Sequence, residues 1–236
     1  MPSHIVLGGE ALDIHIEHVA KSYRLGQVDV IALQDVTLQL PAGDFVSLSG
    51  PSGAGKSTLL GIIGGLERPD AGKILAGEQD LTALDSEGLA MYRRHSVGFI
   101  FQSFRLLPAL TALENVMIPL VPLVESDEAK QKQVIEALDR VNIAHRAGHL
   151  PGELSGGEQQ RVAIARAIVN GPNVILADEP TGELDRRNGE LIMQLLRELN
   201  QSGAATIVVA SHDPDVVGAA RRQVKMEDGR VVAETA

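Results

Sequence analysis

Residues 50–57 have the sequence Gly50-Pro51-Ser52-Gly53-Ala54-Gly55-Lys56-Ser57. This run has the spacing of a phosphate-binding loop, in which a glycine and four residues precede Gly-Lys-Ser. Residues 45–49 before it are mostly apolar and predict a buried strand, and residues 57–66 after it predict a helix. A strand, a glycine-rich loop and a helix in this order predict an α/β fold with a nucleotide site at the loop, rather than a plain glycine-rich turn.

The chemistry of the loop follows from its residue types. Glycines let backbone N–H groups point inward around phosphate oxygens, and the N-terminus of the following helix adds a partial positive charge. Lys56 is expected to reach the β- and γ-phosphates, and the Ser57 hydroxyl to ligate Mg²⁺. We therefore predict that the segment from Gly50 to Thr58 binds the phosphates of a nucleotide.

Composition restricts the class of protein. The chain has 236 residues, 44% of them hydrophobic and 22% charged, which is typical of a soluble domain of ordinary size. The formal net charge of −10 argues against a dedicated nucleic-acid binder, which usually carries a basic stripe, and no nucleic-acid partner is expected. There is no cysteine, which excludes disulfides and thiolate chemistry.

No membrane-spanning segment is predicted. The longest apolar-rich stretch, residues 106–124, contains Glu114 and three prolines, whereas a spanning helix needs about 20 predominantly apolar residues. The first ten residues lack a basic flank followed by a long apolar core, so no secretory signal is expected there.

The patterns on either side of the loop differ from those in the middle of the chain. Strands are predicted from alternating or continuous apolar residues at 13–19, 35–40, 72–76, 174–177 and 206–210, with a closing hairpin formed by 223–226 and 230–233. Helices are predicted at 86–95, 127–142, 156–170, 188–200 and 216–220. Because strands and helices alternate, the sheet is expected to be mainly parallel and covered by helices, with a helical insertion in the middle.

Two acidic residues follow the apolar run at 174–177. The predicted strand places Asp178 at the carboxyl edge of the sheet, where Mg²⁺ would lie. Glu179 can then polarise the water that attacks the γ-phosphate. The alternative is a strand with a polar end. The chain lacks the Asn-Lys-x-Asp guanine reader expected of a GTPase.

The run Leu154-Ser155-Gly156-Gly157-Glu158-Gln159 is the most specific segment of the chain. Ser155 and two glycines open a predicted helix and form a second anion-binding helix end. The run resembles the signature of the ATP-binding cassette (ABC) ATPases. This resemblance implies that the signature of one subunit covers the γ-phosphate held by another, so that ATP joins a head-to-tail dimer of two copies.

Other segments match the same family in order. The resemblance implies that Gln102 belongs to the glutamine loop and touches Mg²⁺. It also implies that residues 181–185 form the D-loop, whose Asp185 crosses the dimer interface. It implies that His212 contacts the γ-phosphate and that Tyr23 stacks on adenine. The fold that it implies is a single ABC ATPase domain over about residues 12–232, a P-loop NTPase with a RecA-like, mainly parallel sheet. An antiparallel β subdomain joins this core (together about 12–84 and 171–232), and a helical subdomain spans about 85–170.

Further segments, among them residues 98–104 and 177–182, resemble the branch of lipoprotein release (LolD), macrolide export (MacB) and the cell-division ATPase FtsE, and particularly the YbbA group. The chain departs from the common pattern at Glu183, usually Asn, and at Ala54, often Ser. This branch implies a membrane subunit on a separate chain, so the protein would lie at the cytoplasmic face of the membrane.

The resemblance also implies a groove near residues 102–108 that receives a short helix of the membrane subunit. Phe101, Phe104, Leu106 and Leu107 would line that groove or pack within the helical insertion. The output is expected to be export or extraction of lipophilic or lipoprotein cargo, or transmission of force. The alternatives are FtsE-like control of an envelope or lipid-processing enzyme and, less favoured, a soluble ABC ATPase without a transport role. The sequence does not identify the cargo.

Overall fold

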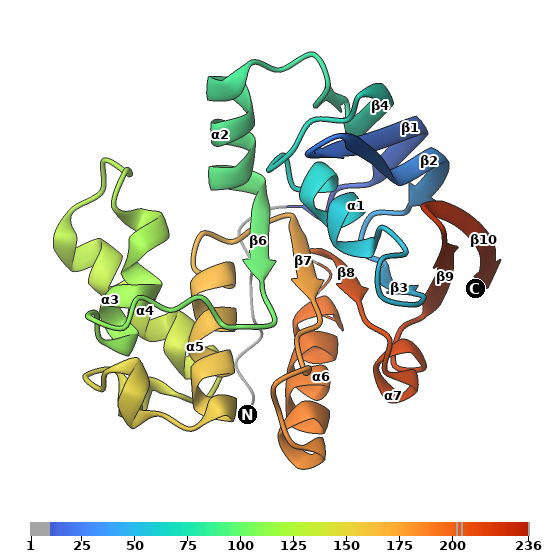
Figure 1. Cartoon of the computed structure of the whole chain (residues 1–236). Helices are drawn as coiled ribbons and strands as arrows, with labels where there is room; N and C mark the ends of the chain where they lie inside the picture. Colours follow the sequence, from blue (N-terminus) through green and yellow to red (C-terminus); the bar gives the residue numbers. More distant parts are fainter. Residues whose placement is uncertain (1–9, 202, 204, 236) are drawn as a thin grey trace.

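The computed structural model describes residues 10–201, 203 and 205–235, and it contains two sheets with helices packed around the larger one (Figure 1). The strands are β1 Ile14–Leu25, β2 Val28–Leu40, β3 Phe45–Ser49, β4 Ala71–Ala76, β5 Gln79–Asp80, β6 Val97–Ile100, β7 Val174–Asp178, β8 Thr206–Ala210, β9 Arg222–Glu227 and β10 Arg230–Thr235. The helices are α1 Lys56–Ile63, α2 Ser86–Ser96, α3 Ala112–Met117, α4 Asp127–Arg140, α5 Gly156–Ile168, α6 Arg186–Gln201 and α7 Pro214–Val217, with short 3₁₀ turns η1 Ile118–Leu120, η2 Ala144–Arg146 and η3 Pro151–Glu153.

The larger sheet has the strand order β10-β9-β3-β8-β7-β6. Strands β9, β3, β8, β7 and β6 are parallel, and β10 pairs antiparallel with β9. The smaller sheet has the order β2-β1-β4-β5 and is antiparallel. The predicted fold class, a mainly parallel core with an antiparallel β subdomain and added helices, is confirmed.

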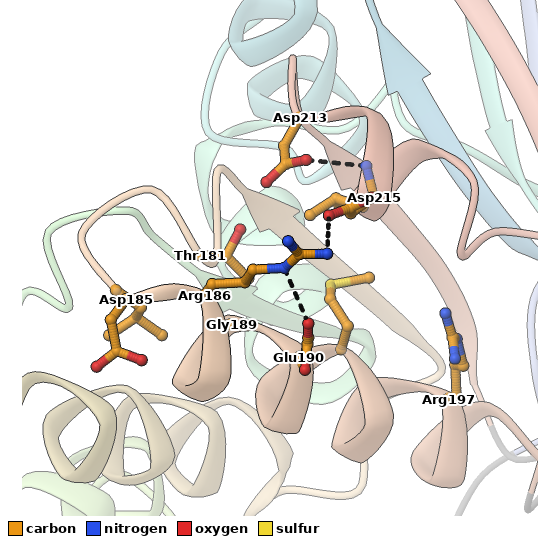
Figure 2. Close-up of a pocket in the computed structure, with 11 residues that line it drawn as sticks. Thr181, Asp185, Arg186, Gly189, Glu190, Arg197, Asp213 and Asp215 are labelled. Carbon is orange, nitrogen blue, oxygen red and sulfur yellow. Dashed lines mark hydrogen bonds and ion pairs between the residues drawn. The ribbon is translucent and has the colours of Figure 1, made fainter.

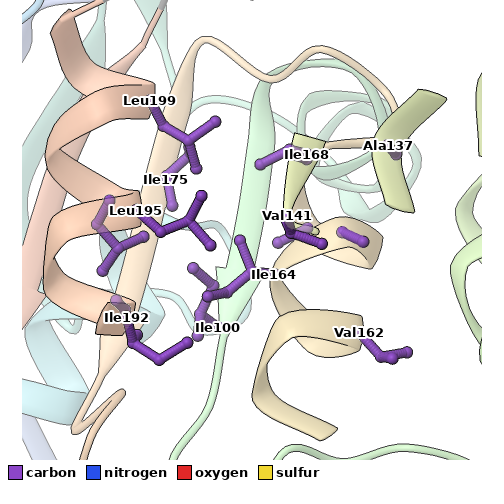
Figure 3. Packing of buried hydrophobic residues seen from close by; sticks show 14 of the residues in the cluster. Ile100, Ala137, Val141, Val162, Ile164, Ile168, Ile175, Ile192, Leu195 and Leu199 are labelled. Atoms are coloured by element: carbon purple, nitrogen blue, oxygen red, sulfur yellow. The ribbon is translucent and has the colours of Figure 1, made fainter. Parts of the chain in front are cut away.

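Two apolar clusters cover the two faces of the larger sheet. On one face, α1 packs between the sheets, because its Leu59 and Ile62 share a buried cluster with Ile16 of β1 and Leu48 of β3. On the other face, helices α5 and α6 pack against β6 and β7 (Figure 3). The apolar residues of α6 recur every three or four positions, so one side of the helix faces the sheet.

Strand β6 is the main difference from the sequence prediction. It lies at the edge of the larger sheet and pairs with β7, so the predicted helical segment 85–170 includes a strand of the core. A side chain at Gly98 would meet the carbonyl oxygen of Ala167 at 2.3 Å. Glycine in this short strand allows close approach of the end of α5 to the sheet, and a four-residue strand with such a glycine carries a weak pattern.

Several helix ends also differ from the prediction by one to three residues. Helix α1 ends at Ile63, before Gly64 and Gly65, and not at residue 66. Helix α7 begins at Pro214, two residues before the predicted start, because the Asp213 side chain accepts a hydrogen bond from the backbone of Asp215 and proline suits the first helical position.

The helices of the structure are short or carry polar and charged residues. Within residues 10–201, 203 and 205–235, no helix has the length and apolar character needed to cross a bilayer. The expectation that the chain opens without a secretory signal concerns residues that lie almost entirely outside the described part.

Candidate nucleotide site

The glycine-rich loop joins β3 to α1, as predicted, and glycine is required at two of its positions. Gly50 has a φ of 144°, and a side chain there would lie 2.1 Å from the carbonyl oxygen of Met226. Gly55 has a φ of 96°, and a side chain there would lie 2.4 Å from the carbonyl oxygen of Ala32. The loop is therefore held between β9 and β2 at distances that only glycine permits.

Lys56 is the first residue of α1 and is buried. Its ammonium group donates hydrogen bonds to the carbonyl oxygens of Gly50 at 2.7 Å and Pro51 at 3.0 Å. The charge is thus folded back into the loop at the N-terminus of the helix, where an anion is favoured.

Ser57 and Asp178 meet although they are far apart in sequence. The Ser57 hydroxyl donates to Oδ1 of Asp178 at 3.0 Å, at the carboxyl end of β7. Burial raises the pKa of the Asp178 carboxyl above its usual value, and the hydrogen bond from Ser57 acts in the opposite direction. A hydroxyl and a carboxylate oxygen in contact are a donor pair of the kind that Mg²⁺ prefers.

Glu179 is held in an unusual backbone conformation. Its φ is 47°, in the left-handed region, and its N–H donates to the carbonyl oxygen of Ala210 at 2.9 Å. The carboxylate accepts a hydrogen bond from the Ser211 hydroxyl at 3.0 Å and lies 2.7 Å from Nδ1 of His212. The Glu179 side chain is 16% exposed and that of His212 is 68% exposed, so the carboxylate is sheltered behind an open imidazole.

A cavity of about 550 Å³ brings most of the predicted residues together. Its lining residues are Tyr23, Val30, Ile31, Ala32, Ser52, Gly53, Ala54, Gly55, Lys56, Ser57, Thr58, Gln102, Glu179 and His212. Tyr23 lies at this cavity with its hydroxyl hydrogen-bonded to Glu67, and 3.5 Å from the Thr58 hydroxyl. Burial, and then the bond to Glu67, raise the pKa of the Tyr23 phenol.

Gln102 lies at the same cavity but contacts the D-loop. A side chain built on Gly182 would lie 3.0 Å from Nε2 of Gln102, so the amide packs against the Gly182 backbone. Pro180, the residue directly before the D-loop, is held by Gln160 of α5, which is fully buried and donates to the carbonyl oxygen of Pro180 at 2.6 Å.

The predicted signature residues do not line this cavity. Ser155 is exposed and caps α5, with its hydroxyl and backbone N–H both donating to Glu158 at 2.8 Å. These bonds, and then the Arg146 guanidinium at 3.0 Å, lower the pKa of the Glu158 carboxyl. Gly156 and Gly157 follow in the first turn of α5.

Asp185 lies at the start of α6, where it accepts a hydrogen bond from the Asn188 backbone at 2.9 Å. A side chain on Gly157 would meet Asn188 at 2.8 Å, so α5 and the start of α6 touch. One chain therefore brings together the phosphate-binding loop, Asp178, Glu179, Gln102, Tyr23 and His212. Ser155 and Asp185 of the same chain lie outside this cavity.

A second cavity, of about 410 Å³, lies between α6 and α7 (Figure 2). Its central cation is already paired, because Arg186 lies 3.2 Å from Glu190 and 3.6 Å from Asp215. Asp185 lines this cavity, but the phosphate-binding loop does not, so the cavity at the loop is the candidate nucleotide site.

Sequence reasoning missed three partners of the site. Ser211 holds Glu179, Glu67 holds Tyr23, and β2 supplies the apolar wall formed by residues 30–32. Of these, only Ser211 is indicated by the sequence, because it lies between a buried strand and His212. The wall depends on how the smaller sheet meets the loop, which local sequence does not indicate.

Comparisons with known proteins agree with this geometry. A family model described as ABC transporter matches residues 33–182. The ABC transporter ATP-binding protein MJ0796 of Methanocaldococcus jannaschii is 46% identical over 225 residues, which cover 94% of this chain and 96% of that protein. The macrolide export ATP-binding/permease protein MacB of Bradyrhizobium diazoefficiens is 46% identical over 219 residues, covering 93% of this chain and 33% of MacB. The chain thus spans about a third of the MacB relative.

Solved structures give the same result. The dimeric structure of the MJ0796 cassette has a TM-score of 0.87 and 45% identity, and covers 94% of this chain and 97% of the solved chain. A dimeric post-hydrolysis state of MJ0796 with ADP and Pi also has a TM-score of 0.87, with 44% identity and the same coverage. The expected likeness to the LolD, MacB and FtsE branch is confirmed, and the finer likeness to the YbbA group stays a prediction. The chain belongs to the ABC transporter family, as an ATP-binding cassette with the fold and the ATPase activity of that family.

Proposed function

We propose that two copies of this chain form a head-to-tail dimer around two ATP molecules and use hydrolysis to drive a separate membrane subunit. The observation that carries the proposal is the division of the site within one chain. The phosphate loop, Glu179 and His212 share one cavity, whereas Ser155, at a second anion-binding helix end, is exposed elsewhere. The dimeric MJ0796 structures support a partner copy that supplies this second helix end.

In this proposal the loop binds the phosphates. Backbone N–H groups of residues 50–58 and the Lys56 ammonium contact the β- and γ-phosphates, because the loop already directs this charge inward. Ser57 and Asp178 hold Mg²⁺, with Gln102 as a further oxygen ligand, and their contact fits such a site. The ion supplies neutralisation of charge on the transferred phosphoryl group.

Glu179 is the proposed general base. It accepts a proton from the attacking water while the water oxygen bonds to the γ-phosphorus and the bond to the bridging oxygen of ADP breaks. Its bond from Ser211 fixes the carboxylate, and His212, which is more exposed, donates to a γ-phosphate oxygen. The strained φ of Glu179 fits a functional position, since such strain persists where surrounding bonds hold it.

The remaining assignments concern the base and the dimer seam. Tyr23 stacks on adenine, with its ring oriented by Glu67. Ser155, Gly156, Gly157 and Glu158 of one copy face the γ-phosphate in the other copy, and Asp185 crosses the seam. Support for the last point is the contact of α5 with the start of α6, which places both segments on one side of the chain.

The membrane subunit is proposed on a separate chain, at whose cytoplasmic face this protein would lie. The support is that MJ0796 matches over nearly its whole length without further segments, whereas MacB carries permease in its name and is three times longer than the match. The cargo class proposed from this branch is lipophilic or a lipoprotein. FtsE-like control of an envelope enzyme uses the same chemistry, and purification with the membrane subunit followed by mass spectrometry separates the two.

The substitution Glu179→Gln tests the dimer. It keeps the shape of the side chain and the bond from Ser211 but removes the base, so hydrolysis should fall by a factor of about 10²–10⁴. With Mg-ATP the variant should elute from gel filtration at twice the 25.1 kDa mass of the chain, and without Mg²⁺ as a monomer. The double variant Glu179→Gln/Ser155→Arg is the matched control and should stay monomeric. A persistent Glu179→Gln monomer at saturating Mg-ATP refutes the proposal.

A further inference from the structure

The helix end at Ser155 carries a negative charge of its own. Glu158 lies in the first turn of α5, and its Oε2 accepts hydrogen bonds from the Ser155 hydroxyl and the Ser155 N–H, both at 2.8 Å. The first turn of a helix leaves backbone N–H groups without intrahelical partners, so an anion is favoured there. In the proposed dimer the γ-phosphate of the other copy approaches this same helix end. The carboxylate and the phosphate would then compete for the same donors.

The competition is most direct at the Ser155 hydroxyl. A hydroxyl has a single hydrogen, and that of Ser155 is donated to Glu158. It can be donated to a phosphate oxygen only after it has left the carboxylate, which then lies beside the phosphate with one donor fewer. The bonds from Ser155 lower the pKa of Glu158, so the carboxyl is charged at neutral pH. Its side chain is only 24% exposed, so water screens the repulsion incompletely.

Arg146 supplies a positive charge at this point. Its Nε lies 3.0 Å from Oε1 of Glu158, the carboxylate oxygen that Ser155 does not use. Its Nη1 lies 3.2 Å from Nε2 of His149, which accepts a hydrogen bond when the imidazole is neutral. Within residues 10–201, 203 and 205–235, Glu158 has no other cationic side chain within 4.0 Å. Removal of the guanidinium would therefore leave this carboxylate uncompensated.

Backbone hydrogen bonds fix the turn that carries Arg146. The N–H of Ala112, at the start of α3, donates to the carbonyl oxygen of His149 at 2.8 Å. The N–H of Leu113 donates to the carbonyl oxygen of Ala147 at 2.9 Å. The His149 N–H in turn donates to the carbonyl oxygen of Arg146 at 2.9 Å. Since these bonds involve no atom of the Arg146 side chain, a substitution there should change the charge beside Glu158 and leave the turn in place.

On the basis of the dimer proposed above, we propose that Arg146 is a positioning residue of the signature. It neutralises Glu158, so that Ser155 and the N-terminus of α5 can bind the γ-phosphate held by the other copy. Arg146 acts through Glu158 and does not contact the nucleotide. The role follows from the acid at position 158, because beside a neutral side chain the guanidinium would have no charge to neutralise.

A double-mutant cycle tests this in the full chain carrying Glu179→Gln, with Mg-ATP present. Its members are that parent, Arg146→Gln, Glu158→Gln and the combination of both, and sedimentation equilibrium measures the dimer dissociation constant of each. Arg146→Gln should raise the constant about tenfold for each site, and so about a hundredfold for the two sites of a dimer. In the presence of Glu158→Gln, the same substitution should change the constant by less than about threefold.

Three controls separate this role from a merely structural one. Arg146→Lys keeps the charge and should retain most of the dimerisation. Lys132→Gln removes one positive charge from an exposed ion pair of α4, 4.0 Å from Glu136, and should leave the dissociation constant unchanged. In dilute protein, where the chain is monomeric, Arg146→Gln should bind Mg-ATP as the parent does, because Arg146 does not line the nucleotide cavity.

Three outcomes overturn the inference. They are an unchanged dissociation constant for Arg146→Gln, an equal loss with and without Glu158→Gln, and weaker binding of Mg-ATP by the monomer. The second would show that Arg146 contacts the nucleotide directly or only supports the fold. If the Glu179→Gln parent stays monomeric at saturating Mg-ATP, the function proposed above is refuted, and the role of Arg146 with it. If the parent dimerises and Arg146→Gln dimerises equally well, only the role of Arg146 is refuted.

Discussion

Replacement of Asn115 by alanine should destabilise the loop that connects the glutamine-loop segment to the helical part. Asn115 in α3 is fully buried and has four hydrogen-bond contacts. Oδ1 accepts from the Leu107 N–H at 2.7 Å, and Nδ2 lies 3.1 Å, 2.9 Å and 3.0 Å from the carbonyl oxygens of Leu107, Leu110 and Thr111. One amide therefore closes residues 107–111.

The size of the effect follows from these contacts. Two N–H hydrogens serve three carbonyl oxygens, so the amide makes the equivalent of three full bonds, each with a net value of about 1 kcal/mol. We expect Asn115→Ala to lower the free energy of unfolding by about 3 kcal/mol, and the melting temperature by roughly 6–12 °C. Asn115→Asp should lower the free energy of unfolding further at neutral pH. The aspartate still accepts from the Leu107 N–H, but its buried carboxylate lies against three carbonyl oxygens that it cannot donate to.

Urea unfolding followed by far-ultraviolet circular dichroism measures this, since the chain has no tryptophan to report by fluorescence. Gln194→Ala is the control: its amide is exposed on α6 and donates to the exposed Glu198, so a change within about 0.5 kcal/mol is expected. A loss below about 1 kcal/mol for Asn115→Ala, or equal stability of the alanine and aspartate variants, would show that the reasoning is wrong.

Three further predictions concern the nucleotide site and its partner helix. Lys56→Ala should abolish ATP binding in a calorimetric titration, and an unchanged affinity would disprove its role. Asp178→Asn should abolish hydrolysis yet raise the melting temperature at neutral pH. Because burial raises the folded pKa of Asp178, stability falls as pH rises from the unfolded value through the folded one, and an equal or lower melting temperature for the variant contradicts this. The Glu158 pKa is lowered, so its contribution is present above the ordinary value of 4.5 and is lost as pH falls through the folded pKa. Glu158→Gln should reduce the loss of stability as pH falls through this range. An unchanged loss at low pH would contradict a stabilising role for the Ser155–Glu158 interaction at the start of α5.

The sequence predicts the fold and the loop well because both depend on local patterns. The strand at 45–49 and the helix starting at residue 156 are found at the residues where apolar runs and glycines place them. The contacts of Ser57 with Asp178 and of Glu179 with His212 also follow, since parallel strands end at one edge of the sheet.

Other features depend on tertiary packing and have no local pattern. Strand β6 is only four residues long and is defined by its pairing with β7. Arg94 of α2, Arg105 of the loop after β6 and Arg166 of α5 line one groove, and only the fold brings them together. Similarly, Glu67 reaches Tyr23 across the junction of α1 with the smaller sheet.

Two glutamines hold the D-loop and the residue before it, and this links the timing of the two sites in a dimer. Gln102 packs on Gly182 from the nucleotide cavity, and Gln160 holds Pro180 from the helix that begins at Ser155. A shift of this loop would therefore move two parts of the chain together. They are the chain's own nucleotide cavity and the helix end at Ser155 that faces the other subunit's nucleotide. In the proposed dimer the two sites would therefore hydrolyse ATP together. A heterodimer of one active and one inactive subunit should then hydrolyse ATP at neither site.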